Sequence, residues 1–105
     1  STAWSYNNVA SNLNAQGRYA EAEPLYRKAL DIRARVLGEE HPDTAASYNN
    51  VASNLDDQGR YAEAEPLYRK ALDISARVLG EEHPNTRVFR SNLEECASNR
   101  LKIGP

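Results

Sequence analysis

The stretch QGRYAEAEPLYRKALDI, at residues 16–32, returns unchanged at residues 58–74. The repetition continues on both sides, so that residues 1–42 and 43–84 agree at 37 of 42 positions. A fixed period of this length is the signature of a solenoid or array, in which each unit buries its apolar face by stacking on its neighbours. The five pairs that differ are Ser1/Asp43, Trp4/Ala46, Asn14/Asp56, Ala15/Asp57 and Arg33/Ser75.

Each unit has the periodicity of two helices. Tyr6, Val9 and Leu13 recur at i, i+3 and i+7, which places them on one helix face, together with Ala10. Gly17 follows, and glycine adopts the positive φ of a helix C-terminus without strain. The rest of the unit carries a broad apolar stripe that is typical of a second helix. We expect helices near residues 3–16, 19–37, 45–58 and 61–79.

The link between the units and the last twenty residues complete the fold prediction. The sequence LGEEHPDT ends the second helix at Gly38 and offers Asp43 or Thr44 as the N-cap of the next one. The segment RVFRSNLEECASNRLKI has lost most of the unit but keeps the pattern of a helix, with Val88, Leu93 and Ala97 apolar and a charged outer face, as a terminal cap requires. We predict an all-α solenoid of stacked antiparallel helical hairpins, with repeats at 1–42 and 43–84 and a capping helix and tail at 85–105.

The composition is that of an ordinary globular domain. The 105 residues are 40% hydrophobic and 27% charged, which is enough for one core. The net charge of −2 argues against nonspecific binding to nucleic acid or anionic lipid, and no apolar run is long enough to cross a bilayer. A single cysteine and the lack of a signal peptide predict a cytoplasmic protein. Because the sequence contains no methionine, we expect it to be a piece of a longer array.

The segment YNNVASNLNAQGRYAEAEPLYRKAL resembles a tetratricopeptide repeat. The usual unit has about 34 residues, whereas this one has 42, with the surplus after Ala29. The combination of YNNVA, YAEAEPLYRKAL and LGEEHP is similar to the repeats of kinesin light chains and their bacterial relatives, and the resemblance covers residues 2–84. It implies a right-handed superhelix whose first helices line an inner groove that binds peptides. The matching positions are Tyr6, Val9, Ala10, Leu13, Gly17, Tyr19, Ala22, Tyr26 and Ala29.

No combination of residues predicts catalysis or metal binding. His41 and His83 each lie in EEHP, where adjacent residues rarely converge on one ion, and a metal site needs three or four ligands. Cys96 has no histidine nearby, and its acidic neighbours raise the pKa of a thiol and so weaken it as a nucleophile. The glycines are isolated turn residues rather than a phosphate-binding loop. We therefore predict a noncatalytic protein without a cofactor or a metal.

The predicted binding surface is the face of each first helix that lies opposite its apolar residues, at about 100° per residue. Four of the five differences between the units lie in or just before this helix, whereas Arg33/Ser75 lies in the second helix. Asn12 and Asn54 flank the surface. The candidate peptide-binding residues are Trp4, Asn7, Asn8, Ser11, Asn49, Asn50, Ser53, Asp57, Asn92 and Glu95.

Asn8, Asn50 and Asn92 occupy equivalent positions, one unit apart. Asparagine can donate and accept a hydrogen bond at once, so it can hold a peptide backbone without reading side chains. The resemblance implies such a contact for an asparagine at this position. The alternative is that these asparagines bridge neighbouring helices. Trp4 is either a binding anchor, as tryptophan often is, or a residue that packs on a further repeat.

The charge of this surface predicts the class of ligand. The first helix of both units lacks Lys and Arg, and the second unit adds Asp56 and Asp57. The grooves of kinesin light chains carry basic residues that suit acidic peptides, so the chain departs from that pattern. We therefore expect a neutral or basic peptide rather than an acidic one.

These observations predict a protein–protein interaction scaffold that binds an extended peptide. The alternatives are a structural or self-association module and a ligand-sensing regulatory region of a larger signalling protein, while the near-identical units also fit an engineered array. Self-association is expected because no helix precedes the first unit to cover Tyr6, Val9 and Leu13. With Trp4 and Tyr19, these residues should form an exposed face that pairs with its own copy about a two-fold axis to give a homo-oligomer.

Overall fold

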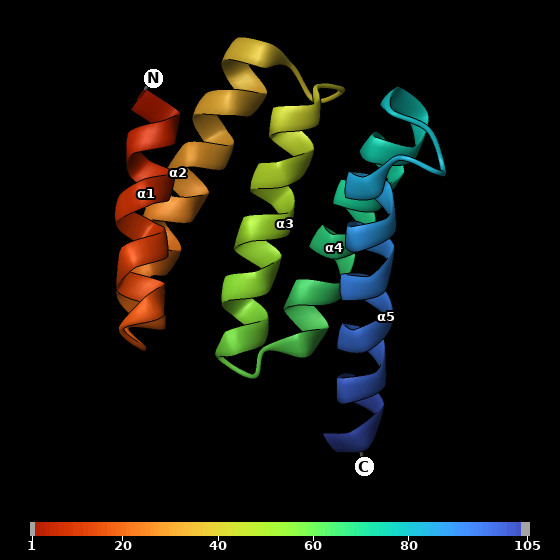
Figure 1. Cartoon of the computed structure of the whole chain (residues 1–105). Coiled ribbons are helices and arrows are strands. Elements are labelled where there is room, and N and C mark those ends of the chain that lie inside the picture. Colours follow the sequence, from red (N-terminus) through yellow and green to blue (C-terminus); the bar gives the residue numbers. More distant parts are fainter. Residues whose placement is uncertain (1, 104–105) are drawn as a thin grey trace.

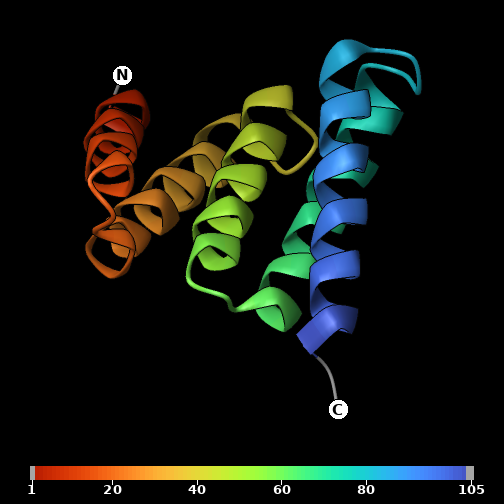
Figure 2. The ribbon, with the colours of Figure 1, turned by 60° about the horizontal axis from the view of Figure 1, so that its bottom comes forward.

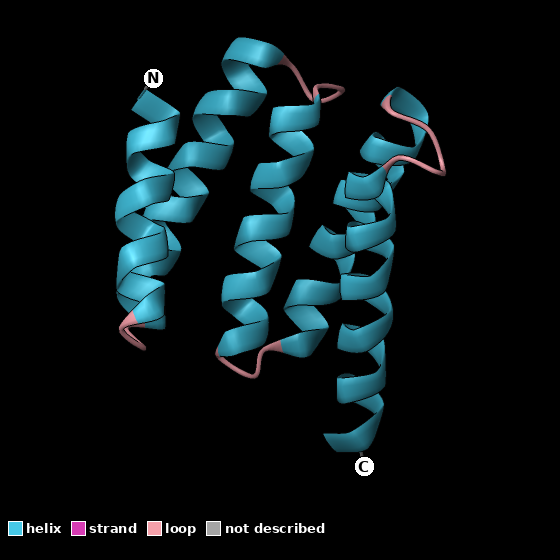
Figure 3. Ribbon diagram, in the orientation of Figure 1, coloured by secondary structure: helices cyan, strands magenta, loops and turns pink. Residues whose placement is uncertain are grey.

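The computed structural model describes residues 2–103, apart from the side chain of Ile103, so that Ser1 of the Ser1/Asp43 difference and the last two residues of the predicted tail lie outside the description. The described chain consists of helices joined by short loops, without a strand, as Figure 3 shows. The prediction of an all-α protein is confirmed. The helices are α1 (Thr2–Ala15), α2 (Tyr19–Leu37), α3 (Pro42–Asp57), α4 (Tyr61–Val78) and α5 (Pro84–Ile103).

The helices form a solenoid of two layers. In Figures 1 and 2, α1, α3 and α5 stand side by side, and α2 and α4 lie behind them and between them. The principal contacts join helices that follow one another in the chain, from α1 on α2 to α4 on α5. This arrangement is the stack of antiparallel hairpins that the 42-residue period predicts.

The helix C-termini use the glycines that the sequence singled out. Gly17 has a φ of +79°, which only glycine adopts without strain. The amide of Arg18 then donates to the carbonyl of Leu13 at 2.9 Å, and the amide of Gly17 donates to Asn14 at 3.0 Å. These two bonds form the glycine-based cap that satisfies the last carbonyls of a helix. Gly38 also has a positive φ, +94°, but its amide donates to the carbonyl of Ala34 at 3.1 Å, so α2 ends on an ordinary helical bond without that cap.

The predicted N-cap of α3 was wrong. The helix begins at Pro42, and the cap is His41, whose Nδ1 accepts from the amide of Asp43 at 3.0 Å. Proline is well suited to the first helical position because its φ is already helical, so the helix starts about three residues earlier than expected. Thr44 donates its hydroxyl instead to the carbonyl of Gly38, at 2.7 Å. His83 accepts from the amide of Asn85 in the same way, so the two EEHP histidines are structural caps.

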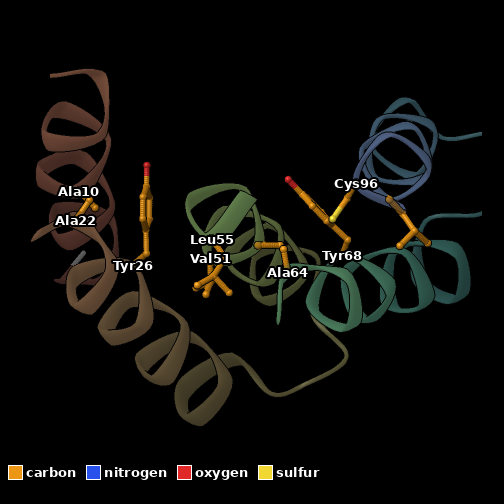
Figure 4. Close-up of a cluster of buried hydrophobic side chains, with 10 residues drawn as sticks. Ala10, Ala22, Tyr26, Val51, Leu55, Ala64, Tyr68 and Cys96 are labelled. Carbon is orange, nitrogen blue, oxygen red and sulfur yellow. The ribbon is translucent and has the colours of Figure 1, made fainter. Parts of the chain in front are cut away.

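The core lies between the two layers (Figure 4). Alanines such as Ala10 and Ala22 are fully buried and allow α1 and α2 to approach closely, while Val51 and Leu55 are fully buried on α3. Tyr26 and Tyr68 stand between neighbouring helices with their rings buried and their hydroxyl groups toward the layer of α1, α3 and α5. One continuous cluster therefore runs from α1 to α5.

The buried face of α5 differs from the one the apolar pattern suggested. Leu93 is buried, but Val88 is 54% exposed. The other buried positions of the described part of α5 are Thr86, Phe89 and Cys96, none of which the apolar pattern had named. They are buried because this side of α5 packs on α4.

Candidate interaction groove

The candidate residues lie on the layer formed by α1, α3 and α5. Asn8 and Ser11 are exposed on α1, whereas Asn50 and Ser53 are half-buried on α3. Glu95 is exposed on α5. Because these three helices stand side by side (Figure 1), the repeated positions form rows across them, one helix apart.

The amides of the row do not all have the same environment. Asn92 Nδ2 donates to Asn49 Oδ1 at 3.1 Å, so these two residues bridge α5 and α3. Asn7 is the equivalent of Asn49 one unit earlier, and its Oδ1 is buried without a hydrogen-bond partner. Within residues 2–103, no side-chain hydrogen bond holds Asn50. The alternative role expected for the asparagines, as bridges between helices, therefore applies to Asn49 and Asn92.

The surface formed by these helices is acidic at the C-terminal end of α3. Asp56 Oδ2 accepts from the Tyr68 hydroxyl at 3.0 Å, and Asp57 Oδ2 accepts from Asn14 Nδ2 at 2.8 Å. Burial raises the pKa of Asp56, and the charges of Asp57 and Glu95 raise it further, although the bond from Tyr68 lowers it. Since neither α1 nor α3 carries Lys or Arg, no cation on these two helices offsets the negative charge.

Trp4 lies near the start of α1 and is 59% exposed. Its counterpart one unit later, Ala46, is half-buried. The large aromatic surface at this end of the row is accessible to a partner.

Asn54, expected at the edge of this surface, is completely buried between α3 and the α1–α2 turn. Its Nδ2 donates to Asn14 Oδ1 and to the carbonyl of Tyr19, both at 2.9 Å. Cys96 occupies the same place on α5, and its thiol donates to the carbonyl of Tyr61 at 3.6 Å. The replacement of asparagine by cysteine was the one sign in the sequence that this position faces inward, because cysteine is among the most buried residue types.

The described residues hold no arrangement suited to metal binding, since no three potential ligands among His, Cys, Asp and Glu converge there. Burial, followed by the charges of Asp56 and Glu65, raises the pKa of the Cys96 thiol to about 11. A thiol so protonated is a poor nucleophile. None of the described helices has the length and apolar character of a membrane span.

A family model for the tetratricopeptide repeat matches residues 1–75 and again residues 55–101. The chain belongs to the tetratricopeptide repeat family. This agrees with the resemblance seen in the sequence, and the family fold is the α-solenoid described above. Membership of this family supports a role as a protein-interaction scaffold.

Two solved structures place this tetratricopeptide protein among the kinesin-light-chain-like members. The nearly identical TPR-like repeats of a kinesin light chain-type protein from Podosopora anserina are 26% identical, with a TM-score of 0.84 over 94% of this chain and 47% of that one. BtubC (BKLC) from P. vanneervenii is also 26% identical, with a TM-score of 0.83 over 93% of this chain and 39% of that one. The tetratricopeptide chain spans less than half the length of these structures. No curated protein matches it.

Proposed function

We propose that the protein is a noncatalytic scaffold that binds an extended peptide in the groove lined by α1, α3 and α5. The observation that carries the proposal is the row of Asn8, Asn50 and Asn92 on three neighbouring helices, in which Asn8 and Asn50 present their amides while Asn92 is held by Asn49. Asn8 is exposed, and the Asn50 amide is free of intramolecular bonds in the part of the chain that the structure describes. Each of these two amides can donate to and accept from a peptide backbone.

The other candidate residues have different proposed roles. Trp4 would anchor an apolar side chain at the α1 end of the groove, while Ser11 and Ser53 would add hydroxyl contacts. Asn49 and Asn92 bond each other, so they would support the groove wall rather than bind the peptide directly. Asn7 is not assigned to either role, because its Oδ1 is buried without a partner and needs a hydrogen-bond donor.

The negative charge of the groove selects the ligand. Asp57 and Glu95 are exposed, and Asp56 lies beside them. A neutral or basic peptide would meet no repulsion there, whereas the negative charges of an acidic peptide would be repelled by these carboxylates. We propose that the chain acts in the cytoplasm, in accord with its one free thiol at Cys96.

A peptide titration tests this function. A lysine-containing extended peptide should bind more tightly than the same peptide with aspartate in place of lysine, and its affinity should fall with salt. Asp57→Asn keeps the acceptor for Asn14 but removes the charge, and should weaken the basic peptide about fivefold. Asp73→Asn makes the same charge change on an exposed position of α4, and should have no effect. Tighter binding of the aspartate peptide, or equal effects of the two variants, would contradict the proposal.

Asn50→Ala tests the backbone contact. It should weaken neutral and basic peptides alike, because the amide would bind the backbone rather than a particular side chain. Isothermal titration calorimetry with both peptides measures this. An effect confined to one peptide would show that Asn50 reads side chains.

A second candidate function is self-association through the first unit. Val9 is 54% exposed, whereas its counterpart Val51 is fully buried. An apolar face of this kind tends to find a partner, and a two-fold pairing with its own copy would close the contact. Sedimentation over a wide concentration range tests it, with Val9→Glu expected to abolish a dimer. A strict monomer at millimolar concentration would rule it out.

A further inference from the structure

Two equivalent pairs of asparagines lie on the layer of α1, α3 and α5, and they are in different states. Asn92 of α5 donates its Nδ2 to Asn49 Oδ1 of α3, at 3.1 Å. Asn50 of α3 and Asn7 of α1 occupy the same two positions one unit earlier. In the described part of the chain no hydrogen bond joins these two, and Asn7 Oδ1 is buried without a partner. The asparagine bridge is therefore made between α3 and α5 and unmade between α1 and α3.

The packing of Phe89 explains why only one bridge is made. Phe89 lies three residues before Asn92, which places the two on one side of α5. It is buried in an apolar cluster against which Tyr48 of α3 packs, so this part of α5 is held close to α3. One unit earlier Ser47 stands in place of Phe89, and it bonds to Arg33 of α2 instead. The amide of Asn92 is thus kept within reach of its partner by an apolar contact that the first unit does not have.

A side-chain amide that is already bonded serves a ligand less well than a free one. The bridge uses one N–H group of Asn92 and fixes the direction of its amide. A peptide that turned this amide toward its own backbone would break the bridge. It would also leave Asn49 Oδ1, on a half-buried side chain, without a donor. At Asn50 no such bond has to be broken, since none holds its side chain within residues 2–103.

We propose that Asn49 determines how far a bound peptide extends along the groove. By holding Asn92, it confines the backbone contacts of the peptide to α1 and α3. These contacts are made by Asn8 and Asn50, while α5 contributes the charge of Glu95. The inference rests on the proposed function, because it concerns the footprint of the same extended peptide. Asn49 is a positioning residue, since it acts through the amide of Asn92 rather than by touching the ligand.

The spacing of the helices converts this footprint into a peptide length. Helices that stand side by side are about 8–10 Å apart, and an extended chain rises about 3.3 Å per residue. About three residues therefore bridge one step between neighbouring helices. A peptide of about four residues spans α1 and α3, and one of about seven residues reaches α5 as well. The length dependence of binding thus reports which amides the peptide uses.

The test compares two uncharged peptides of about four and about seven residues. They are built of serine and threonine and blocked at both ends, so that the charge of Glu95 plays no part. Each is titrated into the isotope-labelled full chain, and the side-chain amide signals are followed. In the wild type both peptides should shift the signals of Asn8 and Asn50 with similar affinity and leave those of Asn92 in place. In Asn49→Ala the longer peptide should also shift the Asn92 signals and should bind about fivefold more tightly than the shorter one.

Further variants separate this effect from a change in the fold. Asn49→Leu has no acceptor but keeps the volume of the side chain, so it should behave like Asn49→Ala even if the smaller residue loosens the packing. Asn49→Asp keeps an acceptor for Asn92 and should behave like the wild type. Asn49→Ala combined with Asn92→Ala should lose the gain, because the released amide is then missing. Asn85→Ala removes the same group from an exposed position at the start of α5 and should change nothing.

Equal affinities of the two peptides for Asn49→Ala and for Asn49→Leu would overturn the inference and show that the bridge is only structural. A gain with peptide length in the wild type, or a shift of its Asn92 amide signals, would overturn it as well. In each of these cases the contacts at Asn8 and Asn50 remain, so the proposed function survives. If neither peptide shifts the signals of Asn8 and Asn50, the proposed function fails and this inference fails with it.

Discussion

Two interfaces in the molecule can be compared, the junction of α2 with α3 and the junction of α4 with α5. The helices α2 and α4 have almost the same sequence, but different side chains fill the two junctions. At the first, Arg33 Nη1 donates to Ser47 Oγ at 3.1 Å. At the second, Ser75 replaces Arg33 and Phe89 replaces Ser47. Phe89 is buried beside Ile74 and Ala71 in a separate apolar cluster. Arg33 facing Ser47 at the first junction thus corresponds to Ser75 facing Phe89 at the second.

This exchange explains the one difference between the units that lies in a second helix. An arginine at position 75 would compete for space with the ring of Phe89, whereas Ser75 leaves room and bonds Thr86 Oγ1 at 2.7 Å. The first junction is less completely filled. Ile32 is half-buried, whereas its counterpart Ile74 is fully buried. An open hollow of about 400 Å³ remains there, lined by Thr2, Ala3, Ile32, Arg33, Val36, Leu37 and Asp43.

The hydrogen bonds between charged side chains are more numerous at the first junction than at the second. Glu23 Oε1 accepts from Arg60 at 2.7 Å and from Gln58 at 3.1 Å, and Glu23 Oε2 accepts from Arg27 at 3.0 Å. Glu65, its counterpart, has one close cross-junction donor, Arg100 at 3.2 Å. The first junction therefore depends more on charged hydrogen bonds, and the second more on buried hydrocarbon.

The largest expected effect is at Phe89. Phe89→Ser should lower the free energy of unfolding by about 3 to 4 kcal/mol, because it leaves a cavity beside Ile74. Ser75→Arg alone should cost about 1 to 3 kcal/mol through overpacking. The double variant recreates the pair found at the first junction, so its cost should be less than the sum by at least about 1 kcal/mol. Urea denaturation followed by circular dichroism measures all three.

Phe89→Leu is the control for this cycle. It keeps an apolar side chain in the same place and should cost less than about 1.5 kcal/mol. Costs of Phe89→Ser and Ser75→Arg that simply add would show that the two positions are independent. The comparison of the junctions would then rest on their polar sides alone.

The next effect is expected at the paired glutamates. Glu23→Gln should cost about 1 to 2 kcal/mol, because it removes the charge from several hydrogen bonds at a mostly buried carboxylate. Glu65 is as shielded as Glu23, but its cross-junction partner Arg100 is exposed and the bond is longer. Glu65→Gln should therefore cost less, under about 0.5 kcal/mol. Equal costs would remove the polar distinction between the junctions.

The Glu23 effect should also depend on pH. Burial raises the pKa of Glu23, but the hydrogen bonds from Gln58, Arg27 and Arg60 outweigh it, so the folded-state pKa is lowered. The stabilisation is therefore present above the unfolded pKa and is lost as the pH falls through the folded one. The wild type and Glu23→Gln should become equally stable at low pH. Thermal unfolding between pH 2 and pH 7 is the measurement.

The smallest effect is expected at Asp56, where the first unit has Asn14. Burial and neighbouring acids raise the pKa of Asp56 in the fold, so folding favours its protonated form. Stability is then lost as the pH rises through the unfolded pKa of about 4 toward the folded one. Asp56→Asn should be more stable than the wild type at pH 7, by less than about 1 kcal/mol, and equal to it at low pH. A destabilised Asp56→Asn would mean that the Tyr68 bond needs the carboxylate.

The helices and their order were predictable from the sequence because their signals are local. The spacing of Tyr6, Val9 and Leu13 indicates one helix face. Gly17 indicates the end of that helix, and this signal does not depend on what the helix packs against. The N-cap was predicted wrongly because His41 and Asp43 both offer an acceptor, and only the early start at Pro42 decides between them. The row of candidate groove residues stays a prediction, because periodicity did not show that Asn54 is buried or that Asn92 bonds Asn49.

What the tertiary structure alone decided is the environment of each copy. Asn12 and Asn54 have the same neighbours in sequence, yet one is exposed and the other is fully buried. The same holds for Val9, 54% exposed, and Val51, which has no exposed surface. A helix pattern fixes which side chains share a face, but burial depends on whether another helix lies on that face. The sequence therefore determined the repeated unit, and stacking determined which copy became core and which remained open to a partner.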